Sequence, residues 1–452
     1  MTEEEKKILL SDVQSLLEQK LYEKLRNRME TANAVDLASV LQEMPTGSLA
    51  VLFRLLPKEL AANTFVEMDS TVQQGLIQGL TDSELRDVVD ELYVDDAADI
   101  VEEMPANVVS RMLSQATPEK RRMINEILNY PEDSAGSIMT TEYVSLRPEM
   151  TVDAAIRRIR ATGVDKETIN TCFVVDAERH LLGTLTIRTI ILAEETTLLR
   201  ELMDGNTVSV TTTEDQETVA GLLARYDMTS LPVVDGEGRL VGIVTIDDAV
   251  DVLVEEATED IEKMAAITPS DKSYMQTSVW ELWKKRIPWL LLLMISATFT
   301  GMIITRFESA LASVVVLTAY IPMLMDTGGN SGSQASVSVI RSISLNELRF
   351  SDLPRVVLKE AAVAVLCGVS LALVGFAKMM LLDHVGAAVA AAVSVTLLTT
   401  VICAKLVGGV LPVVAKKIGF DPAVCASPFI TTIVDAMSLL IYFRVASGML
   451  GL

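Results

Sequence analysis

The alternation of hydrophobic and polar positions divides the chain into three regions. Over the first 130 residues, apolar positions recur at helical spacing in short segments separated by Pro, Gly and capping residues. From about Ser137 to Glu255, short β-branched runs alternate with helical segments. Beyond Ile287, apolar stretches of membrane-spanning length predominate. The pattern predicts a multidomain membrane protein with an all-α part, an α/β part and a transmembrane part.

The first region is predicted to consist of short helices in series. The segment Asp36–Pro45 is echoed by Asp96–Pro105, and both end in Glu-Met-Pro. Repeated helical units of this kind stack into a superhelix. The same periodicity also fits an ordinary interaction module. Helix starts are indicated by Pro57, by the capping box of Thr81 and Glu84, and by Thr117-Pro118.

The second region repeats one order of elements twice: a helix, a strand and the hairpin partner of that strand. β-branched runs joined by Gly-bearing turns favour these hairpins. The first half comprises Val152–Arg160, Thr171–Asp176 and Leu182–Thr186, and the second comprises Val219–Tyr226, Ser230–Asp235 and Leu240–Thr245.

Here the sequence resembles a tandem of cystathionine-β-synthase-type (CBS) domains, through Ile138-Met139-Thr140, Leu231–Asp235 and Gly242–Asp248. Such pairs are regulatory, and many hold adenosine nucleotides through a Thr-x-x-Asp contact to the ribose. The second half keeps this pattern as Thr245 and Asp248. The first half has Thr186 and Thr189, and the missing carboxylate argues against nucleotide binding there. A solvated acidic face is the alternative interpretation of this region.

Charge separates the soluble part from the membrane part. From Trp280 onward, 13 basic and 9 acidic residues give a net charge of +4, which leaves 25 basic and 52 acidic residues, a net of −27, in the first 279. A charge of −27 argues against nucleic acid as a partner and suits a protein that meets cations. The four cysteines are scattered and indicate buried thiols. With only His180 and His384 as histidines, and no nucleophile–base pair or phosphate loop, we do not expect an enzyme.

Five spans are predicted in the last region, and basic residues set their orientation. A tryptophan pair and a basic triplet within Trp280–Arg286 indicate a membrane-entry anchor. Basic residues gather on one side of the spans, which predicts a cytoplasmic N-terminus and an outside C-terminus. Lys405 lies inside the fourth span, where we expect it to snorkel rather than border a pore. The spans are about Ile287–Thr305, Leu311–Met325 with a helical continuation, Val356–Leu382, Val385–Val414 and Ala423–Val445.

Asp435 lies midway along the last apolar stretch. A charge near the bilayer centre costs at least roughly 2.5–3.5 kcal/mol, so such residues usually face a bundle interior or a water-filled path. Pro428 is expected to free the Val424 carbonyl, and Pro428, Thr431, Thr432 and Asp435 share one helix face. Carbonyls, hydroxyls and a carboxylate suit a hydrated divalent cation, since Mg²⁺ gives up its waters reluctantly. One carboxylate per chain favours a symmetric dimer around a central path.

The second span continues into a polar, glycine-rich segment. Unwound or closely approached backbone at membrane depth is tolerated only where it lines a cavity or packs on protein. The spacing of Gly328 and Gly332 also fits close helix packing, which is the alternative. The expected pore-lining residues here are Pro322, Gly328, Gly329, Asn330, Gly332 and Gln334.

The segment between the α/β part and the membrane carries like charges at helical spacing. Asp251 and Glu255, and Glu256 and Asp260, are i,i+4 pairs that cost a few tenths of a kcal/mol each unless they are screened. A bound divalent cation would turn that cost into a gain. A solvated, highly charged helix is the alternative on this pattern alone.

Taken over essentially the whole chain, the sequence resembles the MgtE family of magnesium channels. The motifs are Pro322…Gly328-Gly329-Asn330-x-Gly332-x-Gln334, Glu256–Ile261 and Asp421-Pro422-Ala423, with Asp435 in the last span. The resemblance implies a superhelical domain (1–133), paired CBS domains (134–255), a linking helix (256–285) and a five-helix transmembrane domain (286–452). By motif match the magnesium-sensing ligands would be Asp95, Asp99, Asp215, Glu217, Asp227, Asp248, Asp251, Glu256, Glu259, Asp260 and Asp421.

The resemblance also implies a homodimer in the plasma membrane that imports Mg²⁺ through Asp435. Internal Mg²⁺ would bridge facing carboxylates, compact the acidic region and close the path through the linking helices. Two alternatives remain: a secondary transporter for Mg²⁺, Mn²⁺ or Co²⁺ coupled to Na⁺ or H⁺, and a membrane-anchored sensor. The first would need further ionisable groups at membrane depth, and the second would have no use for Asp435.

Overall fold

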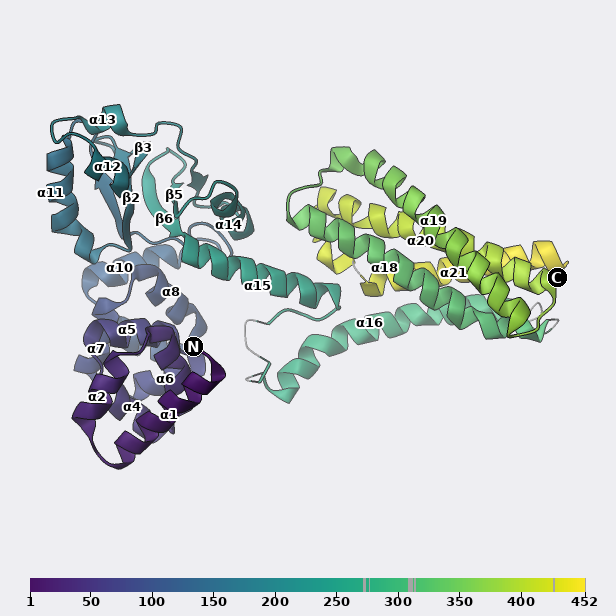
Figure 1. Ribbon diagram of the computed structural model, residues 1–452, viewed down its shortest axis with the longest axis horizontal. Helices are drawn as coiled ribbons and strands as arrows, with labels where there is room; N and C mark the ends of the chain where they lie inside the picture. The colour runs from purple at the N-terminus through teal and green to yellow at the C-terminus, as the bar shows by residue number, and fades with distance from the viewer. Residues whose placement is uncertain (271–273, 276, 308–311, 313, 426, 452) are drawn as a thin grey trace. The chain divides into compact units, whose positions relative to one another are not determined.

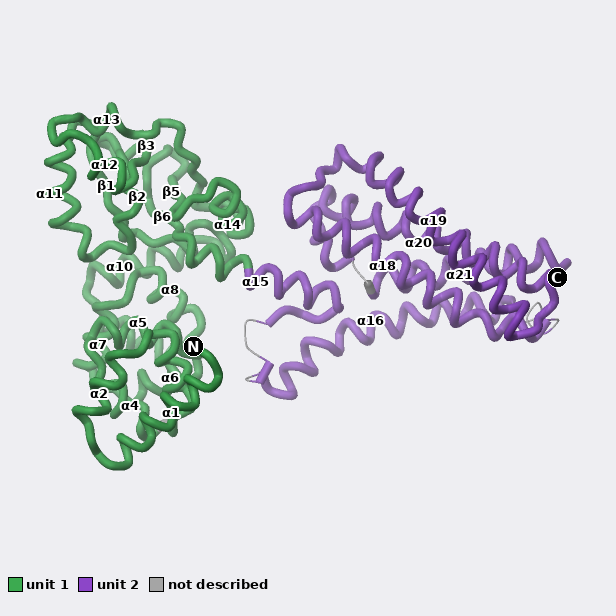
Figure 2. The backbone as a smooth tube through the Cα atoms, viewed as in Figure 1, with its two compact units in different colours: residues 1–253 green, residues 254–452 purple. Residues whose placement is uncertain are grey.

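The computed structural model describes residues 1–270, 274–275, 277–307, 312, 314–425 and 427–451. The chain forms two compact units, Met1–Leu253 and Val254–Leu452 (Figure 2).

The N-terminal half of unit 1 consists of ten consecutive helices around one apolar core (Figure 1). The sequence signals act where expected: Thr81 and Glu84 form a capping box, Thr117 caps its helix with Pro118 at the first position, and Pro57 precedes α5. The helices are α1 Glu3–Glu18, α2 Tyr22–Glu30, α3 Ala34–Leu41, α4 Thr46–Phe53, α5 Lys58–Val66, α6 Ser70–Gly79, α7 Asp82–Glu91, α8 Val94–Glu103, α9 Ala106–Gln115 and α10 Pro118–Ile127.

The other half of unit 1 contains two three-stranded sheets of the same topology. In each sheet the first strand pairs parallel with the second, and the second pairs antiparallel with the third. Both predicted hairpins are confirmed, because the β-branched runs lie in β2–β3 and β5–β6. The elements are β1 Tyr143–Leu146, α11 Val152–Thr162, η1 Gly163–Asp165, β2 Thr168–Val175, β3 Leu181–Thr186, α12 Ile187–Leu192, α13 Leu199–Leu202, β4 Val210–Thr211, α14 Gln216–Arg225, β5 Ser230–Val234 and β6 Leu240–Thr245.

The linking segment differs from the single helix expected over 256–285. Helix α15 starts at Ile246, directly after β6, and ends at Met264, so it begins inside the stretch assigned to the CBS pair. The tryptophan pair belongs to the next helix, α16 Val279–Arg306, which Ser278 starts with a capping box. The predicted boundaries followed the charge pattern, which crosses both helices, whereas the capping residue sets where the second one begins.

Long helices make up the rest of unit 2 (Figure 1). Among the described residues, four segments are long and apolar enough to cross a membrane: Val279–Arg306, Phe350–Leu381, Ala387–Lys417 and Ala423–Leu450. The elements after α16 are η2 Val315–Tyr320, α18 Ile321–Ser344, η3 Phe350–Asp352, α19 Leu353–Leu381, α20 Ala387–Lys417, η4 Ala423–Cys425 and α21 Ser427–Leu450.

The expected second span, Leu311–Met325, is not among these four. Positions 311 and 313 lie outside the described residues, and the part from Val315 onward forms a 3-10 helix followed by α18. Helix α18 is continuous through its glycine-rich segment, so the backbone there is packed rather than unwound. A Cβ at Gly328 would lie 2.7 Å from Thr400 Cγ2, and one at Gly332 would lie 2.7 Å from Ile430 Cγ2. The glycines therefore allow α18 to pack closely against α20 and α21.

Candidate functional site: three groups of carboxylates

The most buried carboxylate of unit 1 is Asp95, in the first turn of α8. Its side chain is 6% exposed, and its buried Oδ1 has no hydrogen-bond partner among the described residues. Oε2 of Glu167, the residue before β2, is also buried without a hydrogen-bond partner among the described residues. The Glu142 carboxylate accepts a hydrogen bond of 3.0 Å from the Val94 amide, which joins the start of α8 to the first CBS half.

Burial is the main cause of the raised pKa values of these carboxylates, and neighbouring negative charges add to it. Burial raises the pKa of Asp95 well above its usual value, and the charge of Asp248 adds to this. Burial, and then the charges of Asp247, Asp96 and Asp248, raise the pKa of Glu167 to about 8. Burial raises the pKa of Asp248, at the start of α15, to about 6, although the hydrogen bond from Thr245 opposes the shift. Unpaired, desolvated carboxylates are costly, and their oxygen atoms fit a hard divalent cation. We call Asp95, Asp96, Glu142, Glu167 and Asp248 the buried acidic cluster.

The structure brings together only part of the expected ligand set in unit 1. Asp95 and Asp248 belong to the buried acidic cluster, and Asp99 lies one turn along α8 with an exposed side chain. Sequence reasoning missed Asp96, Glu142 and Glu167 as cluster members. No periodicity places the last two, because the parallel pairing of β1 with β2 brings them side by side, with the Glu167 amide 2.9 Å from the Glu142 carbonyl.

Three other expected ligands, Asp215, Glu217 and Asp227, lie on α14 or next to its ends, outside this cluster. Asp215 is the N-cap of α14, where its Oδ1 accepts hydrogen bonds from the amides of Glu217 and Thr218 at 3.0 and 3.4 Å. Asp227 follows the C-terminal end of the same helix and has a φ of 50°. The two ends of a helix of ten residues are about 15 Å apart, so one ion in a single chain cannot bind both ends.

A second acidic group lies in unit 2, where α15 meets the helices of the membrane part. The Ser344 hydroxyl donates a 3.0 Å hydrogen bond to Asp260 Oδ2. Lys263 Nζ lies 2.6 Å from Glu259 Oε1 and 2.7 Å from Asp421 Oδ2. Burial lowers the pKa of Lys263, but hydrogen bonds to Asp421 and Glu259 more than offset this and raise it. We call these residues the linking site. Of the other two expected ligands on α15, Asp251 belongs to unit 1 and Glu256 to unit 2.

The third group is in the membrane part. Asp435 lies in the third turn of α21, and its buried Oδ1 has no hydrogen-bond partner among the described residues. Thr431 and Thr432 are partly exposed one turn earlier. Pro428 corrects the sequence expectation: α21 begins at Ser427, so this proline is in the first helical turn and interrupts no helical hydrogen bond. The Val424 carbonyl belongs to η4, not to this helix.

The expected pore-lining residues of α18 divide between two faces. Gly328, Gly329 and Gly332 are buried against neighbouring helices. Pro322, Asn330 and Gln334 are exposed on the other face of the single chain.

Lys405 is 4% exposed within α20. Snorkelling would have left its ammonium group at the membrane edge, so that expectation is wrong.

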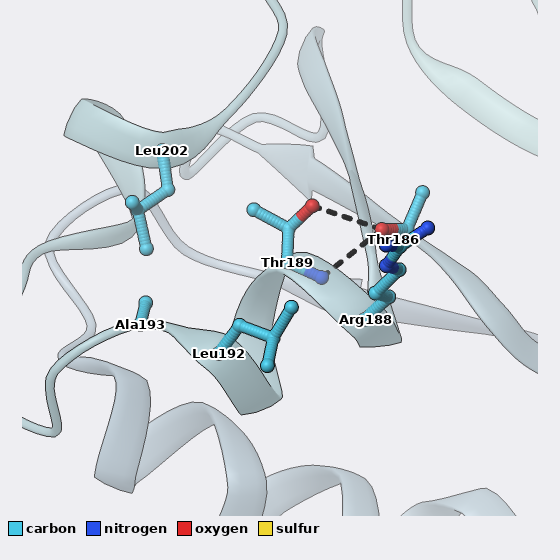
Figure 3. Close-up of a pocket in the computed structure, with 6 residues that line it drawn as sticks. All are labelled: Thr186, Arg188, Thr189, Leu192, Ala193 and Leu202. Atoms are coloured by element: carbon cyan, nitrogen blue, oxygen red, sulfur yellow. Dashed lines mark hydrogen bonds between the residues drawn. The ribbon is translucent and has the colours of Figure 1, made fainter.

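The possible nucleotide sites remain without support from a ribose-binding carboxylate in the first CBS half. There, Thr186 Oγ1 lies 2.9 Å from Thr189 Oγ1, beside an open pocket that Arg188, Leu192 and Leu202 also line (Figure 3). In the second half, the Thr245 hydroxyl donates a 2.5 Å hydrogen bond to Asp248 Oδ2. Asp248 also belongs to the buried acidic cluster, so the same carboxylate is shared between two possible roles.

A helical N-terminal half, two halves of CBS-type topology and helices of membrane-spanning length define a multidomain membrane protein. The sequence matches three family descriptions: "Divalent cation transporter" (MgtE) over residues 321–445, "MgtE intracellular N domain" over 32–133, and "CBS domain" over 135–195 and 199–255.

Two full-length relatives extend the match. The chain is 38% identical to "Magnesium transporter MgtE" of Thermus thermophilus, covering 93% of this chain and 94% of the relative. It is 31% identical to the protein of the same name from Bacillus subtilis, covering 94% and 93%. A crystal structure of the cytosolic domain of the Mg²⁺ channel MgtE in complex with ATP matches 54% of this chain and 99% of that chain, with 38% identity and a TM-score of 0.52. The chain belongs to the MgtE family of divalent cation transporters, which is not an enzyme family.

Proposed function

We propose that this chain carries Mg²⁺ across the plasma membrane through a passive, ion-conducting path in a homodimer. The observation that carries the proposal is Asp435: a carboxylate in a membrane-length helix with a buried, unpartnered oxygen atom. Such a group is costly in lipid and favourable beside a hydrated cation. The names of the two full-length relatives, both magnesium transporters, support Mg²⁺ as the substrate.

Passive conduction is preferred to coupled transport because the described spans hold few further ionisable groups at depth. Lys405 is buried in α20, and an ammonium group offers no oxygen ligand for Na⁺. Exchange of Mg²⁺, Mn²⁺ or Co²⁺ for Na⁺ or H⁺ remains the alternative. The charge asymmetry of the spans supports an internal N-terminus and an external C-terminus.

Internal Mg²⁺ would regulate the path through the two acidic regions. Asp95, Glu167 and Asp248 would hold an ion in the buried acidic cluster, where ionised carboxylates otherwise repel one another. At the linking site, Glu259, Asp260 and Asp421 would hold a second ion that fastens α15 to the helices of the membrane part. In this structure Lys263 lies between Glu259 and Asp421, so Mg²⁺ would compete with its ammonium group. Binding at both regions would stabilise a closed path.

Proteoliposomes containing the full chain and a Mg²⁺ indicator test this function. We expect Mg²⁺ influx that follows the Mg²⁺ electrochemical gradient. The influx should fall as the Mg²⁺ concentration rises on the side of the membrane that unit 1 faces. Collapsing the Na⁺ and H⁺ gradients should leave the flux unchanged, whereas a coupled transporter would stop. Absence of Mg²⁺ flux from the wild-type chain in either orientation would contradict the proposal.

A further inference from the structure

We propose that Asp326 of α18 is a second carboxylate of the conducting path, placed at the level of Asp435, and that it strengthens the selection of divalent over monovalent cations. This inference rests on the proposed function and adds to it a specificity-determining residue that the motifs do not mark. The first support is the distribution of polar residues around α18.

The exposed side of α18 is a polar stripe. Five exposed residues follow one another at four-residue spacing, which forms a ridge that winds slowly around the helix, and the apolar Val337 is exposed beside it. In a helix that faced lipid, such a stripe would be apolar, because a carboxylate in hydrocarbon is strongly unfavourable. The stripe therefore faces water or protein in the assembled molecule. Its members are Pro322, Asp326, Asn330, Gln334 and Ser338.

The packing of α18 on α21 places Asp326 beside Asp435. A Cβ at Gly332 would touch Ile430, and a Cβ at Gly328 would lie 2.9 Å from Val434 Cγ1. The later glycine of α18, Gly332, meets the earlier residue of α21, Ile430, so the two helices are antiparallel. Continuing this register by half a turn brings the level of Asp326 to Asp435.

Two carboxylates at one level change what the path prefers to bind. A dication gains twice the Coulomb energy of a monovalent ion from each added negative charge. Asp326 is exposed in the single chain while Asp435 is partly buried. The waters of a hydrated ion could therefore donate hydrogen bonds to both carboxylates while the ion keeps its inner shell. The amide side chains of Asn330 and Gln334 extend the same oxygen-bearing stripe along α18.

The test measures Mg²⁺ influx into proteoliposomes against external Mg²⁺ concentration for the full chain and Asp326→Asn. We expect the half-saturating Mg²⁺ concentration to rise about tenfold, equivalent to ~1.4 kcal/mol, with a smaller change in maximal flux. Block of monovalent current by Mg²⁺ should weaken in parallel. Asp326→Glu, which keeps the charge, should restore the wild-type half-saturation.

Glu347→Gln is the matched control, because Glu347 is an exposed carboxylate just beyond the C-terminal end of α18. It should leave both flux parameters unchanged. If Asp326→Asn does not assemble, Asp326→Ser removes the same charge with a smaller side chain and is measured in its place. Half-saturation equal to that of the wild type and of Glu347→Gln overturns this inference alone. A wild-type chain without Mg²⁺ flux overturns the proposed function and this inference with it.

Discussion

The buried acidic cluster of unit 1 and the linking site of unit 2 solve the same electrostatic problem in different ways. In the cluster, Asp95 is buried with an unpartnered oxygen atom, and none of the ion pairs among the described residues includes Asp95 or Asp248. At the linking site, Glu259 and Asp421 share the ammonium group of Lys263. One group of carboxylates depends on a proton or an external cation, and the other has a cation of its own.

We expect the two regions to respond differently to Mg²⁺. Buried carboxylates such as Asp95, which belong to none of the ion pairs among the described residues, change the stability of the fold steeply when a dication binds, because binding relieves both repulsion and desolvation. A site that already holds an ammonium group gains less from the same ion. We therefore expect unit 1 to respond most strongly to Mg²⁺ and the linking site to set the state that is adopted without it.

The substitution with the largest expected effect on Mg²⁺ influx lies outside both acidic regions, at Asp435. If the buried acidic cluster and the linking site only regulate transport, conduction is lost only when the conducting path itself is changed. Asp435→Ala should therefore lower Mg²⁺ influx by at least about 100-fold, the equivalent of ~3 kcal/mol. Flux into proteoliposomes measures this, and size-exclusion chromatography checks that the dimer persists. Normal influx by this variant would remove Asp435 from the path.

Within the cluster, Asp95→Asn should make unit 1 more stable without Mg²⁺ and less responsive to it. At pH 8 with a chelator, neutralising a buried, unpartnered carboxylate should raise the free energy of unfolding by about 3 kcal/mol. The stabilisation that Mg²⁺ gives the wild type should be largely lost. Thermal or denaturant unfolding measures both quantities. Glu59→Gln, an exposed carboxylate of α5, is the control, and equal behaviour of the two variants would contradict the assignment of the cluster.

The pH dependence of the cluster has a defined sign. Its carboxyls have higher pKa values in the folded than in the unfolded protein, Glu167 about 8 and Asp248 about 6, so the folded state binds more protons. The stabilisation is fully present below the unfolded pKa of roughly 4 and is lost as pH rises through 6 to 8. Without Mg²⁺, unit 1 should lose about 2 kcal/mol of stability between pH 6 and 8. Saturating Mg²⁺ should flatten this profile, and a profile that rises with pH would contradict the burial of these groups.

Sequence patterns predicted the elements better than they predicted the groups of carboxylates. The short helices, both hairpins and most spans follow from periodicity and local capping, as with Thr81 and Thr117. The family resemblance named Asp95, Asp248 and Asp421 as ligands, which remains a prediction; the structure places Asp95 and Asp248 in the buried acidic cluster and Asp421 at the linking site. Glu142 and Glu167 escaped, because only the pairing of β1 with β2 brings them together.

The predictions for Pro428 and Lys405 were wrong because each depends on a structural detail that the sequence pattern does not give. A proline at the start of a helix and one inside it look alike until the first helical residue is known. Burial of Lys405 depends on the packing of α20 against its neighbours. The polar stripe of α18 was present in the sequence at four-residue spacing, but without the exposed fractions Asp326 looked like a residue near the end of a span.

Lys263 offers the finest test of the comparison, because removing it should make the linking site resemble the buried acidic cluster. Lys263→Met leaves Glu259 and Asp421 without their ammonium partner. If that partner holds α15 against the membrane part when Mg²⁺ is absent, influx at zero internal Mg²⁺ should rise, by up to about fivefold for a partly exposed ion pair worth ~1 kcal/mol. Inhibition at high internal Mg²⁺ should persist, because the carboxylates remain. Lys263→Arg is the matched control and should behave as the wild type. Unchanged influx at zero Mg²⁺ in Lys263→Met would show that the two acidic regions do not differ in the way their counter-ions suggest.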